Sequence, residues 1–371
     1  MKKIIIILAA AVAAFACTKA EVDNGREISF QIASGSIRTR ATVGEAYSTS
    51  VPFGTYAWFN DSDEFMVNEQ VGFVTPVWKT VDHTFYWPKT GAVSFISYSP
   101  FKGSSNVAGT APAITKNSIS YSGITAGTED IMYADKVSCS SNVNEVSDNA
   151  VAGSTDNGYN GVPTVFHHAL AKLSFKVKLN FTEYDDAATG SHTEWEVTLN
   201  SFKIGGFKTT GDCALTLNAD GSSWDKPVTN VGGTDYHVWT NLSGATTGQE
   251  LVTTPIVLTT TEQDLGAATG FVIPQMLEAG VQTVQINAHI KTTLSNGKVI
   301  NEDYPKTIDI SSISSLKAWQ MNQNINYVIK FKPTATSATD PHYDDPEDVT
   351  ITFDPAVAQW EDVSTSATIQ L

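Results

Sequence analysis

The 371-residue sequence is poor in cysteine and in charge, and its longest apolar run is short. Three cysteines are too few for a small scaffold that depends on disulfides. Charged residues make up 17% of the chain, and 23 basic residues stand against 39 acidic ones, a formal net charge of -16. That charge has the wrong sign for binding a phosphate backbone, so the composition excludes nucleic acid as a partner.

Motifs for catalysis or cofactor binding are lacking too. No segment matches a glycine-rich phosphate loop, a serine-hydrolase elbow or an HExxH zinc helix. His167 and His168 are adjacent, and neighbours on a strand face opposite sides, so a shared metal is not expected. The acidic run 340–348 could offer oxygen ligands to calcium, but its two prolines and its spacing favour a solvated linker. Asp61 is expected to be an exposed carboxylate, and its contribution to solubility is sufficient reason for its presence. We therefore expect no enzyme, no cofactor and no metal site.

What is present favours strands. The chain has 44 threonines and 10% aromatic residues. Apolar and polar residues alternate from Leu173 to Phe181, the period of a half-buried strand. A hairpin is predicted over 284–300, where Asn296-Gly297 supplies the positive φ angles of a tight turn. Helical spacing is found only over 312–320, which predicts one short helix. These patterns predict an all-β fold of sandwiches rather than a parallel α/β sheet.

The first 16 residues have the layout of a secretory signal peptide. Two lysines precede thirteen apolar residues, Ile4 to Ala16, which are too few to span a bilayer because a spanning helix needs about 20. The sequence Ala14-Phe15-Ala16-Cys17 resembles a bacterial lipobox, although it lacks leucine three residues before the cysteine. We expect Cys17 to be acylated and to become the new first residue. The alternative is a plain secreted protein whose cysteine lies near the cut by chance.

If Cys17 carries lipid, two cysteines remain for the body of the protein. Cys139 and Cys213 lie 74 positions apart in segments of different pattern. A disulfide between them is possible but is not implied by the sequence. A chain of this length can be stabilised by its hydrophobic core, so we expect two buried free thiols.

Arginine occurs only three times, at Arg26, Arg38 and Arg40, all within the first 40 residues. The small, polar residues around the last two suit proteolysis. We expect an arginine-specific protease to cut after Arg40, so that Ala41 becomes the first residue, with Arg38 as the alternative site. The other interpretation is that a lysine-biased composition clusters three arginines by accident.

A short alternating segment precedes this processing site. Ile28, Phe30 and Ile32 are predicted on one face of a strand, with polar residues between them. Cleavage after Arg38 or Arg40 would cut the covalent link between this strand and everything it packs against. Residues 17–40 are thus interpreted as a lipidated propeptide with a removable strand, and its departure would open a groove.

Six segments spread along the chain form a recognisable series. They are Tyr86-Trp87-Pro88, the run from Val93 to Pro100, the run from Thr128 to Ala134, the run from Phe166 to Leu173, Asn326-Tyr327-Val328-Ile329 and the run from Val357 to Trp360. In this order, and with the lipobox and an arginine before residue 41, they resemble the fimbrillin family, the subunits of type V pili.

The resemblance implies two tandem transthyretin-like β-sandwich domains with Greek-key connections. Turn-rich composition over 138–161 places their boundary, giving domains over 41–165 and 166–371, the second including a tail strand over 349–371. It also implies handling by the lipoprotein export and acylation machinery. A lipid-anchored precursor in the cell outer membrane would become a subunit of a cell-surface fimbrium that supports adhesion, attached to the membrane through lipid only before processing.

The end of the chain is patterned like a strand. Five residues alternate with polar ones up to the terminal carboxylate: Val363, Thr365, Ala367, Ile369 and Leu371. Most chain ends fray, so a patterned end indicates a partner. We interpret this tail as the donor strand that fills the groove of a neighbouring fimbrillin subunit. The alternative is an ordinary final strand that pairs within its own domain.

Eight tryptophans raise a competing function, a surface-anchored glycan-binding β-sandwich lipoprotein. Sugar faces stack on aromatic rings, which would have to be exposed. Trp87, Trp195 and Trp319 fall in apolar-patterned positions and are predicted in the core or at an interface. A binding lipoprotein would also keep the residues before Ala41.

Overall fold

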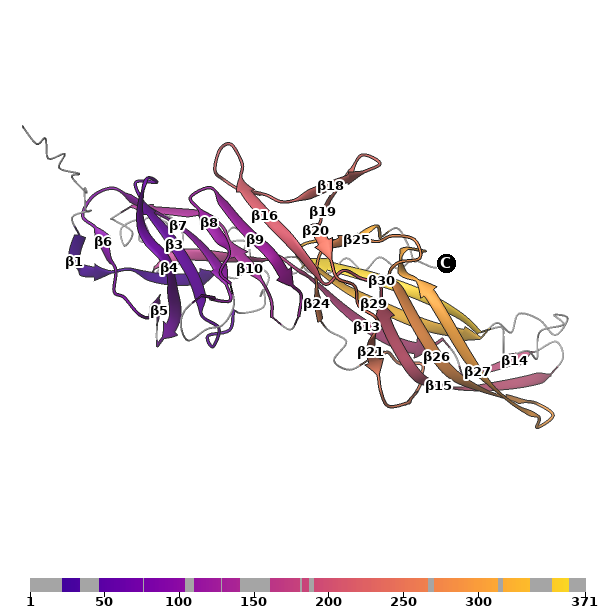
Figure 1. Ribbon diagram of the computed structural model, residues 1–371. Helices are drawn as coiled ribbons and strands as arrows, with labels where there is room; N and C mark the ends of the chain where they lie inside the picture. The colour runs from indigo at the N-terminus through magenta and orange to yellow at the C-terminus, as the bar shows by residue number, and fades with distance from the viewer. Residues whose placement is uncertain are drawn as a thin grey trace, which may run out of the picture.

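The protein is an elongated chain of β-sheets (Figure 1). A computed structural model describes residues 22–33, 47–75, 77–103, 110–127, 129–140, 161–180, 182–186, 190–265, 270–312, 316–333 and 349–359. Within those ranges there is no α-helix, and the only helical element is the 3₁₀ turn η1 (Ile310–Ser312). None of the described segments forms a helix with the length and apolarity to cross a bilayer. The all-β prediction is confirmed.

The N-terminal half is an eight-stranded sheet that closes on itself. In sheet order its strands are β10 (Met132–Ala134), β12 (Val162–His168), β2 (Ser29–Ala33), β5 (Val77–Thr80), β4 (Asp63–Val74), β3 (Phe53–Phe59), β7 (Ala92–Ser99) and β11 (Val137–Ser140). Strand β10 also pairs with β7, so seven of the eight strands form a closed circuit of hydrogen-bonded neighbours. A closed sheet has no free edge along that circuit.

A smaller sheet lies between the two halves. Its strands are β17 (Trp224–Asp225), β16 (Thr210–Leu217), β9 (Ser118–Thr125) and β8 (Ala113–Thr115), with β20 (Thr240–Ser243) paired to β16. Strand β7 is buried on both faces because Phe95 points into the N-terminal core while Ile96 packs with Ile119 and Leu215 of this middle sheet. That position explains why β7 is almost wholly buried rather than alternating.

The C-terminal half is a sandwich of two sheets. One contains β23 (Gln263–Asp264), β13 (Ala171–Leu179), β29 (Gln323–Pro333) and β30 (Val349–Gln359), with β24 (Gly270–Val272) on β13. The other contains β14 (Glu183–Asp186), β15 (Ser191–Gly205), β26 (Thr283–Leu294) and β27 (Val299–Asp309), with β21 (Gln249–Val252) and β22 (Ile256–Val257) on β15. Phe175 of the first sheet contacts Phe202 of the second at 5.4 Å between ring centroids, inside the largest core cluster.

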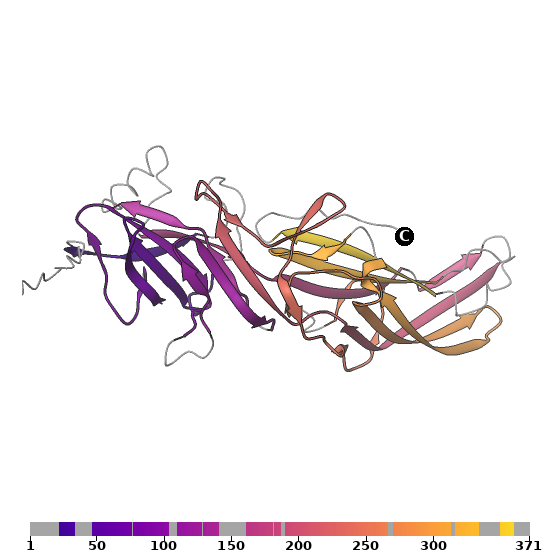
Figure 2. The same ribbon diagram turned by 45° about the horizontal axis from the view of Figure 1, so that its top comes forward.

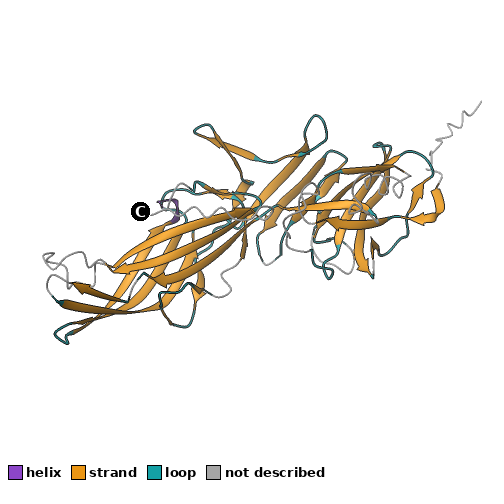
Figure 3. Ribbon diagram, turned by 180° about the vertical axis from the view of Figure 1, so that it is seen from behind, coloured by secondary structure: helices purple, strands orange, loops and turns teal. Residues whose placement is uncertain are grey.

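Three two-stranded pairs complete the fold. They are β1 (Val22–Glu27) with β6 (Tyr86–Pro88), β18 (Val228–Val231) with β19 (Thr234–His237), and β25 (Gln275–Met276) with β28 (Ala318–Trp319). The β18–β19 hairpin projects from the body of the molecule in all three views (Figures 1, 2 and 3).

The sequence predicted two of these elements well and one wrongly. Strand β13 buries every second residue, as its alternation predicts, and β26 and β27 form the expected antiparallel hairpin. The short helix predicted over 312–320 is wrong in the described part of that range, because Ala318 and Trp319 form a strand against β25. Trp319 is fully buried and donates its indole N–H to the Tyr327 hydroxyl at 2.8 Å, a tertiary contact that overrides the local spacing.

Candidate functional site

The predicted removable strand is a full member of the closed N-terminal sheet. Ile28 immediately precedes β2, which contains Phe30 and Ile32. Strand β2 runs antiparallel to β5 on one side and parallel to β12 on the other. The register places Phe30 opposite both Trp78 and Val162. Residues upstream of the predicted cleavage site therefore complete a sheet whose other strands all lie downstream of it.

The side chains of this segment alternate as the sequence predicts. Ile28 is 0% and Phe30 is 2% exposed, and Ile32 is half-buried against the same core. The ring of Phe30 meets the rings of Phe53 and Phe95 edge to face, at centroid distances of 5.6 Å and 5.7 Å. Such pairs stabilise a core beyond their buried area. The slot that holds β2 is thus lined with aromatic rings and requires a bulky apolar residue at its centre.

Contacts of residues 27–29 fix the start of the segment. The Ile28 amide donates to the Phe85 carbonyl oxygen at 2.8 Å, directly after β1, which pairs with β6. At the neighbouring strand, a Cβ on Gly161 would lie 2.6 Å from the Ser29 carbonyl oxygen, so only glycine allows β12 to approach this closely. On the β5 side, Lys79 Nζ lies 3.6 Å from Glu27 Oε1, a partly exposed ion pair that adds little.

The C-terminal strand ends at the edge of its own sheet. Strand β30 pairs antiparallel with β29 over eleven positions, from Pro333–Val349 to Gln323–Gln359, and has no second neighbour within the part of the chain that the structure describes. The proposed donor residues, Val363, Thr365, Ala367, Ile369 and Leu371, lie outside the described residues. So do Cys17, Arg38, Arg40, Ala41 and the acidic run 340–348.

Both cysteines of the body are free and buried, as predicted. Burial raises the pKa of the Cys139 thiol to about 11 and that of Cys213 to about 12. At neutral pH both are therefore thiols, the unreactive form. Cys139 packs in the N-terminal core cluster and Cys213 in the cluster around the middle sheet, so they act as small apolar side chains.

The histidine pair of β12 separates as expected for adjacent strand residues. His167 Nε2 lies 3.0 Å from Asp135 Oδ1, whereas His168 Nδ1 lies 2.6 Å from Asp130 Oδ2. Each ring therefore faces a different carboxylate, and both contacts tie β12 to segments beside β10. This arrangement fits a structural role.

One group that sequence reasoning missed could hold a metal ion. Glu183, His192 and Glu194 bring one ligand atom each within 4.8 Å of one another on the outer face of β14 and β15. In the structure His192 is clamped by carboxylates instead, with Nδ1 2.6 Å from Asp185 Oδ1 and Nε2 3.1 Å from Glu194 Oε1. The sequence signal for this group is the alternation of acidic residues in two segments. The strand register brings them together, because it places Glu183 opposite Glu194 and Asp185 opposite His192.

The carboxylate clamp gives His192 a distinctive titration. Hydrogen bonds to Asp185 and Glu194 raise the pKa of His192 above its ordinary value of 6.5. Because the pKa of His192 is higher in the folded than in the unfolded protein, the clamp stabilises the fold fully at pH values below the unfolded-state pKa. This stabilisation is lost as the pH rises through the folded-state pKa. We expect Asp185→Asn to lower the His192 midpoint in a proton NMR titration. Glu196→Gln is the control, since Glu196 faces Lys291 at 3.8 Å; an equal drop in both variants would contradict the clamp.

The tryptophans do not form an exposed platform. All seven in the described ranges are between 0% and 7% exposed, including the three predicted in the core: Trp58, Trp78, Trp87, Trp195, Trp224, Trp239 and Trp319. Trp224 and Trp239 donate their indole N–H groups to backbone carbonyls at 3.0 Å and 2.8 Å. Rings held this way cannot stack on a sugar, so these residues do not support glycan binding.

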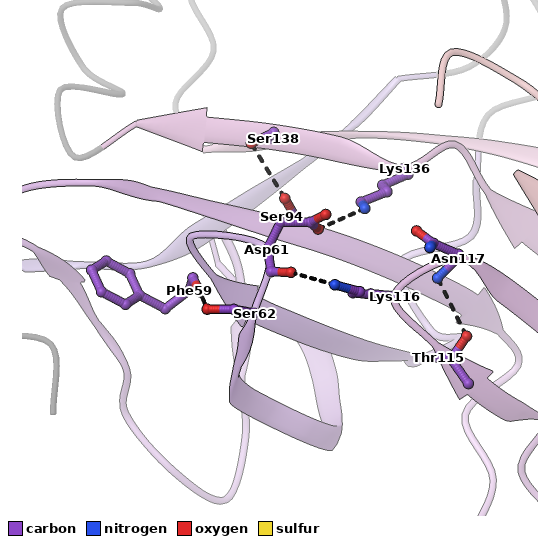
Figure 4. A network of polar contacts seen from close by, with 9 residues as sticks. All are labelled: Phe59, Asp61, Ser62, Ser94, Thr115, Lys116, Asn117, Lys136 and Ser138. Atoms are coloured by element: carbon purple, nitrogen blue, oxygen red, sulfur yellow. Dashed lines mark hydrogen bonds and ion pairs between the residues drawn. The ribbon is translucent and has the colours of Figure 1, made fainter. Parts of the chain in front are cut away.

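Asp61 has a structural role that composition alone did not reveal. Lys136 Nζ lies 2.7 Å from its carboxylate, and Lys116 Nζ donates to its carbonyl oxygen at 2.9 Å (Figure 4). Lys116 lies in the turn between β8 and β9, and Lys136 immediately precedes β11. The network therefore fastens the β3–β4 turn to both the middle sheet and the edge of the N-terminal sheet.

A family model described as fimbrillin-like matches residues 39–360. No curated protein matches the chain. Among solved structures, a fimbrial protein from Bacteroides vulgatus shares 15% identity over 90% of this chain and 99% of its own, with a TM-score of 0.50. The fimbrial anchor protein Mfa2 from Porphyromonas gingivalis shares 9% identity over 88% of this chain and 96% of its own, with a TM-score of 0.25.

Proposed function

Because this chain belongs to the fimbrillin-like family, a family of fimbrial structural subunits rather than enzymes, we propose that it is a fimbrial subunit that polymerises by strand exchange. Its partners are other fimbrial subunits and its place is the cell-surface fimbrium. We extend the proposal to two tandem transthyretin-like domains with Greek-key connections, predicted over 41–165 and 166–371. Since β12 pairs with β10 as far as His168, we move the proposed boundary to the end of that strand.

The maturation pathway follows from the order of segments along the chain. Residues 1–16 direct export, Cys17 is acylated, and the precursor is held in the outer membrane by lipid. An arginine-specific protease then cuts after Arg40, or after Arg38. Multiple acyl chains would anchor the precursor firmly, since each buried methylene contributes about 0.8 kcal/mol. Cleavage frees the body of the subunit from that anchor.

The observation that carries the proposal is the place of β2. It fills a slot between β5 and β12, yet it lies upstream of the cleavage site. Its loss would break the closed circuit and leave two unpaired strand edges, and such edges accept an added strand. Burying a large apolar side chain contributes about 1.5–3 kcal/mol, so a cut strand anchored by Ile28 and Phe30 stays bound until a competitor displaces it.

The tail of the next subunit is the competitor we propose. Val363, Ile369 and Leu371 supply apolar side chains on one face, and backbone hydrogen bonds to β5 and β12 would replace those of β2. Ordering the tail costs conformational entropy, which offsets part of the free energy gained from its apolar contacts and hydrogen bonds. The tail therefore replaces β2 when it buries more apolar surface in the slot than β2 did. The resulting head-to-tail chain is the fimbrial shaft, and it supports adhesion of the cell.

Blocking the cut tests the pathway. Arg38→Ala with Arg40→Ala should keep β2 attached to the subunit, so that mass spectrometry after treatment with an arginine-specific protease still finds residues 27–40 in the chain, whether or not Arg26 is cut, and fibre formation should fall at least tenfold. Arg26→Ala is the matched control, because Arg26 lies upstream of the strand. Normal fibres from the double variant would contradict the proposal.

A further inference from the structure

Tyr47 is the first described residue after β2 along the chain. It lies downstream of both Arg38 and Arg40, so it stays with the subunit when the propeptide is removed. Its side chain is half-buried, and burial raises its pKa well above the ordinary value of 10. Its hydroxyl is 2.7 Å from Ser99 Oγ at the end of β7. A retained, neutral and anchored ring therefore sits in the N-terminal core.

The contacts of this ring reach both strands that flank β2. Tyr47 stacks on Phe166 of β12 at a centroid distance of 5.0 Å and an interplanar angle of 16°. It meets Trp78 of β5 edge-on at 5.5 Å, and Phe53 of β3 at 6.4 Å. Tyr47 therefore connects β5 and β12 directly and without β2, beside Phe53 of β3, whose ring lies 5.7 Å from that of Trp78 and 5.4 Å from that of Phe166.

On the β12 side the register places this connection at the end of the slot, whereas on the β5 side it reaches Trp78, opposite Phe30. Strand β12 pairs with β2 from Val162–Phe30 to Val165–Ala33, and Phe166 is the next residue of β12. The core row filled by Ile28, Phe30 and Ile32 is therefore followed directly by the Tyr47 ring on Phe166. An inserted strand cannot extend its apolar row past this ring without displacing it.

We propose that Tyr47 is a positioning residue, a fixed brace that holds β5 and β12 apart when β2 leaves and that limits an incoming strand to three apolar core positions. This inference rests on the proposed function. It requires a strand whose central side chain is bulky, since that position lies between Phe53 and Phe95. The tail triplet that meets this requirement is Ala367, Ile369 and Leu371, with Ile369 in the centre.

Binding of a short peptide to the emptied slot tests the brace. The full chain is cut with an arginine-specific protease, separated from residues 1–40 in denaturant, refolded, and titrated with a fluorescent peptide of residues 27–33. Tyr47→Ala should weaken peptide binding at least tenfold, whereas Tyr47→Phe, which keeps the ring and loses the Ser99 bond, should stay within about threefold. Val93→Ala is the matched control, because Val93 is fully buried in the same core but on β7.

The outcomes separate this inference from the proposed function. Equal binding by folded Tyr47→Ala and by the unaltered protein, or equal losses in Tyr47→Ala and Val93→Ala, would overturn the brace and leave strand exchange intact. If the unaltered trimmed protein neither binds the peptide nor forms fibres, the proposed function fails instead. Should Tyr47→Ala not fold, Tyr47→Leu replaces it, with the same tenfold loss expected and the same outcomes deciding.

Discussion

Replacing Phe30 with alanine should lower the free energy of unfolding of the untrimmed protein by about 3–5 kcal/mol and leave mature fibres unaffected. The loss in the precursor follows from the burial of Phe30 and its contacts with two other rings. The lack of effect in fibres follows from the proposed removal of residue 30 with the propeptide. Urea unfolding of the precursor, followed through tryptophan fluorescence, and thermal dissociation of fibres measure the two quantities.

Phe95→Ala is the matched control for this experiment. Phe95 is 1% exposed and packs against Phe30, but it lies on β7 and stays in the mature subunit. Its truncation should destabilise precursor and fibre alike. If fibres made from Phe30→Ala lost as much thermal stability as fibres made from Phe95→Ala, residue 30 would still be present in the fibre, contrary to the proposal.

Removing Val363 to Leu371 should give a folded subunit that forms no fibres. The deletion begins beyond β30, which ends at Gln359 and keeps its pairing with β29, so the C-terminal sandwich should melt as before. The truncated subunit keeps its slot and lacks a donor. Added to intact trimmed subunits, it should therefore terminate growth and shorten fibres in electron micrographs in proportion to its share.

A pair of neighbouring substitutions controls for loss of length. Ile369→Asp places a charge on the face of the tail that we expect to enter the slot, whereas Gln370→Asp places it on the opposite face. The first should abolish growth, because an unpaired charge in an apolar slot is strongly unfavourable, and the second should reduce it little. Equal effects of the two would contradict insertion of a patterned strand.

The sequence predicted elements correctly where the hydrophobic period of a segment agrees with the packing around it in the folded protein. Alternation at Ile28, Phe30 and Ile32 identified a buried strand, and the Asn296-Gly297 turn identified the β26–β27 hairpin. Both are local patterns that tertiary packing reinforces. The core positions of Trp87, Trp195 and Trp319 followed from the same kind of pattern.

Partner strands and registers could not be predicted in the same way. Nothing near β2 indicates that it pairs parallel to β12, and nothing near β9 indicates that it pairs with β16. Such pairings depend on the closure of the whole sheet rather than on any segment. The helix predicted around Trp319 is wrong for the same reason, because the pairing of β28 with β25 determines the backbone conformation there.

The central claim is that the mature subunit has lost a strand of its own and gained one from a neighbour. Mass spectrometry of subunits from fibres isolated from the cell surface tests it most directly. The account predicts a chain that begins at Ala41, or at Thr39 if Arg38 is the site used, and no peptide covering β2. Intact fibres whose subunits still contain residues 27–33 would contradict it.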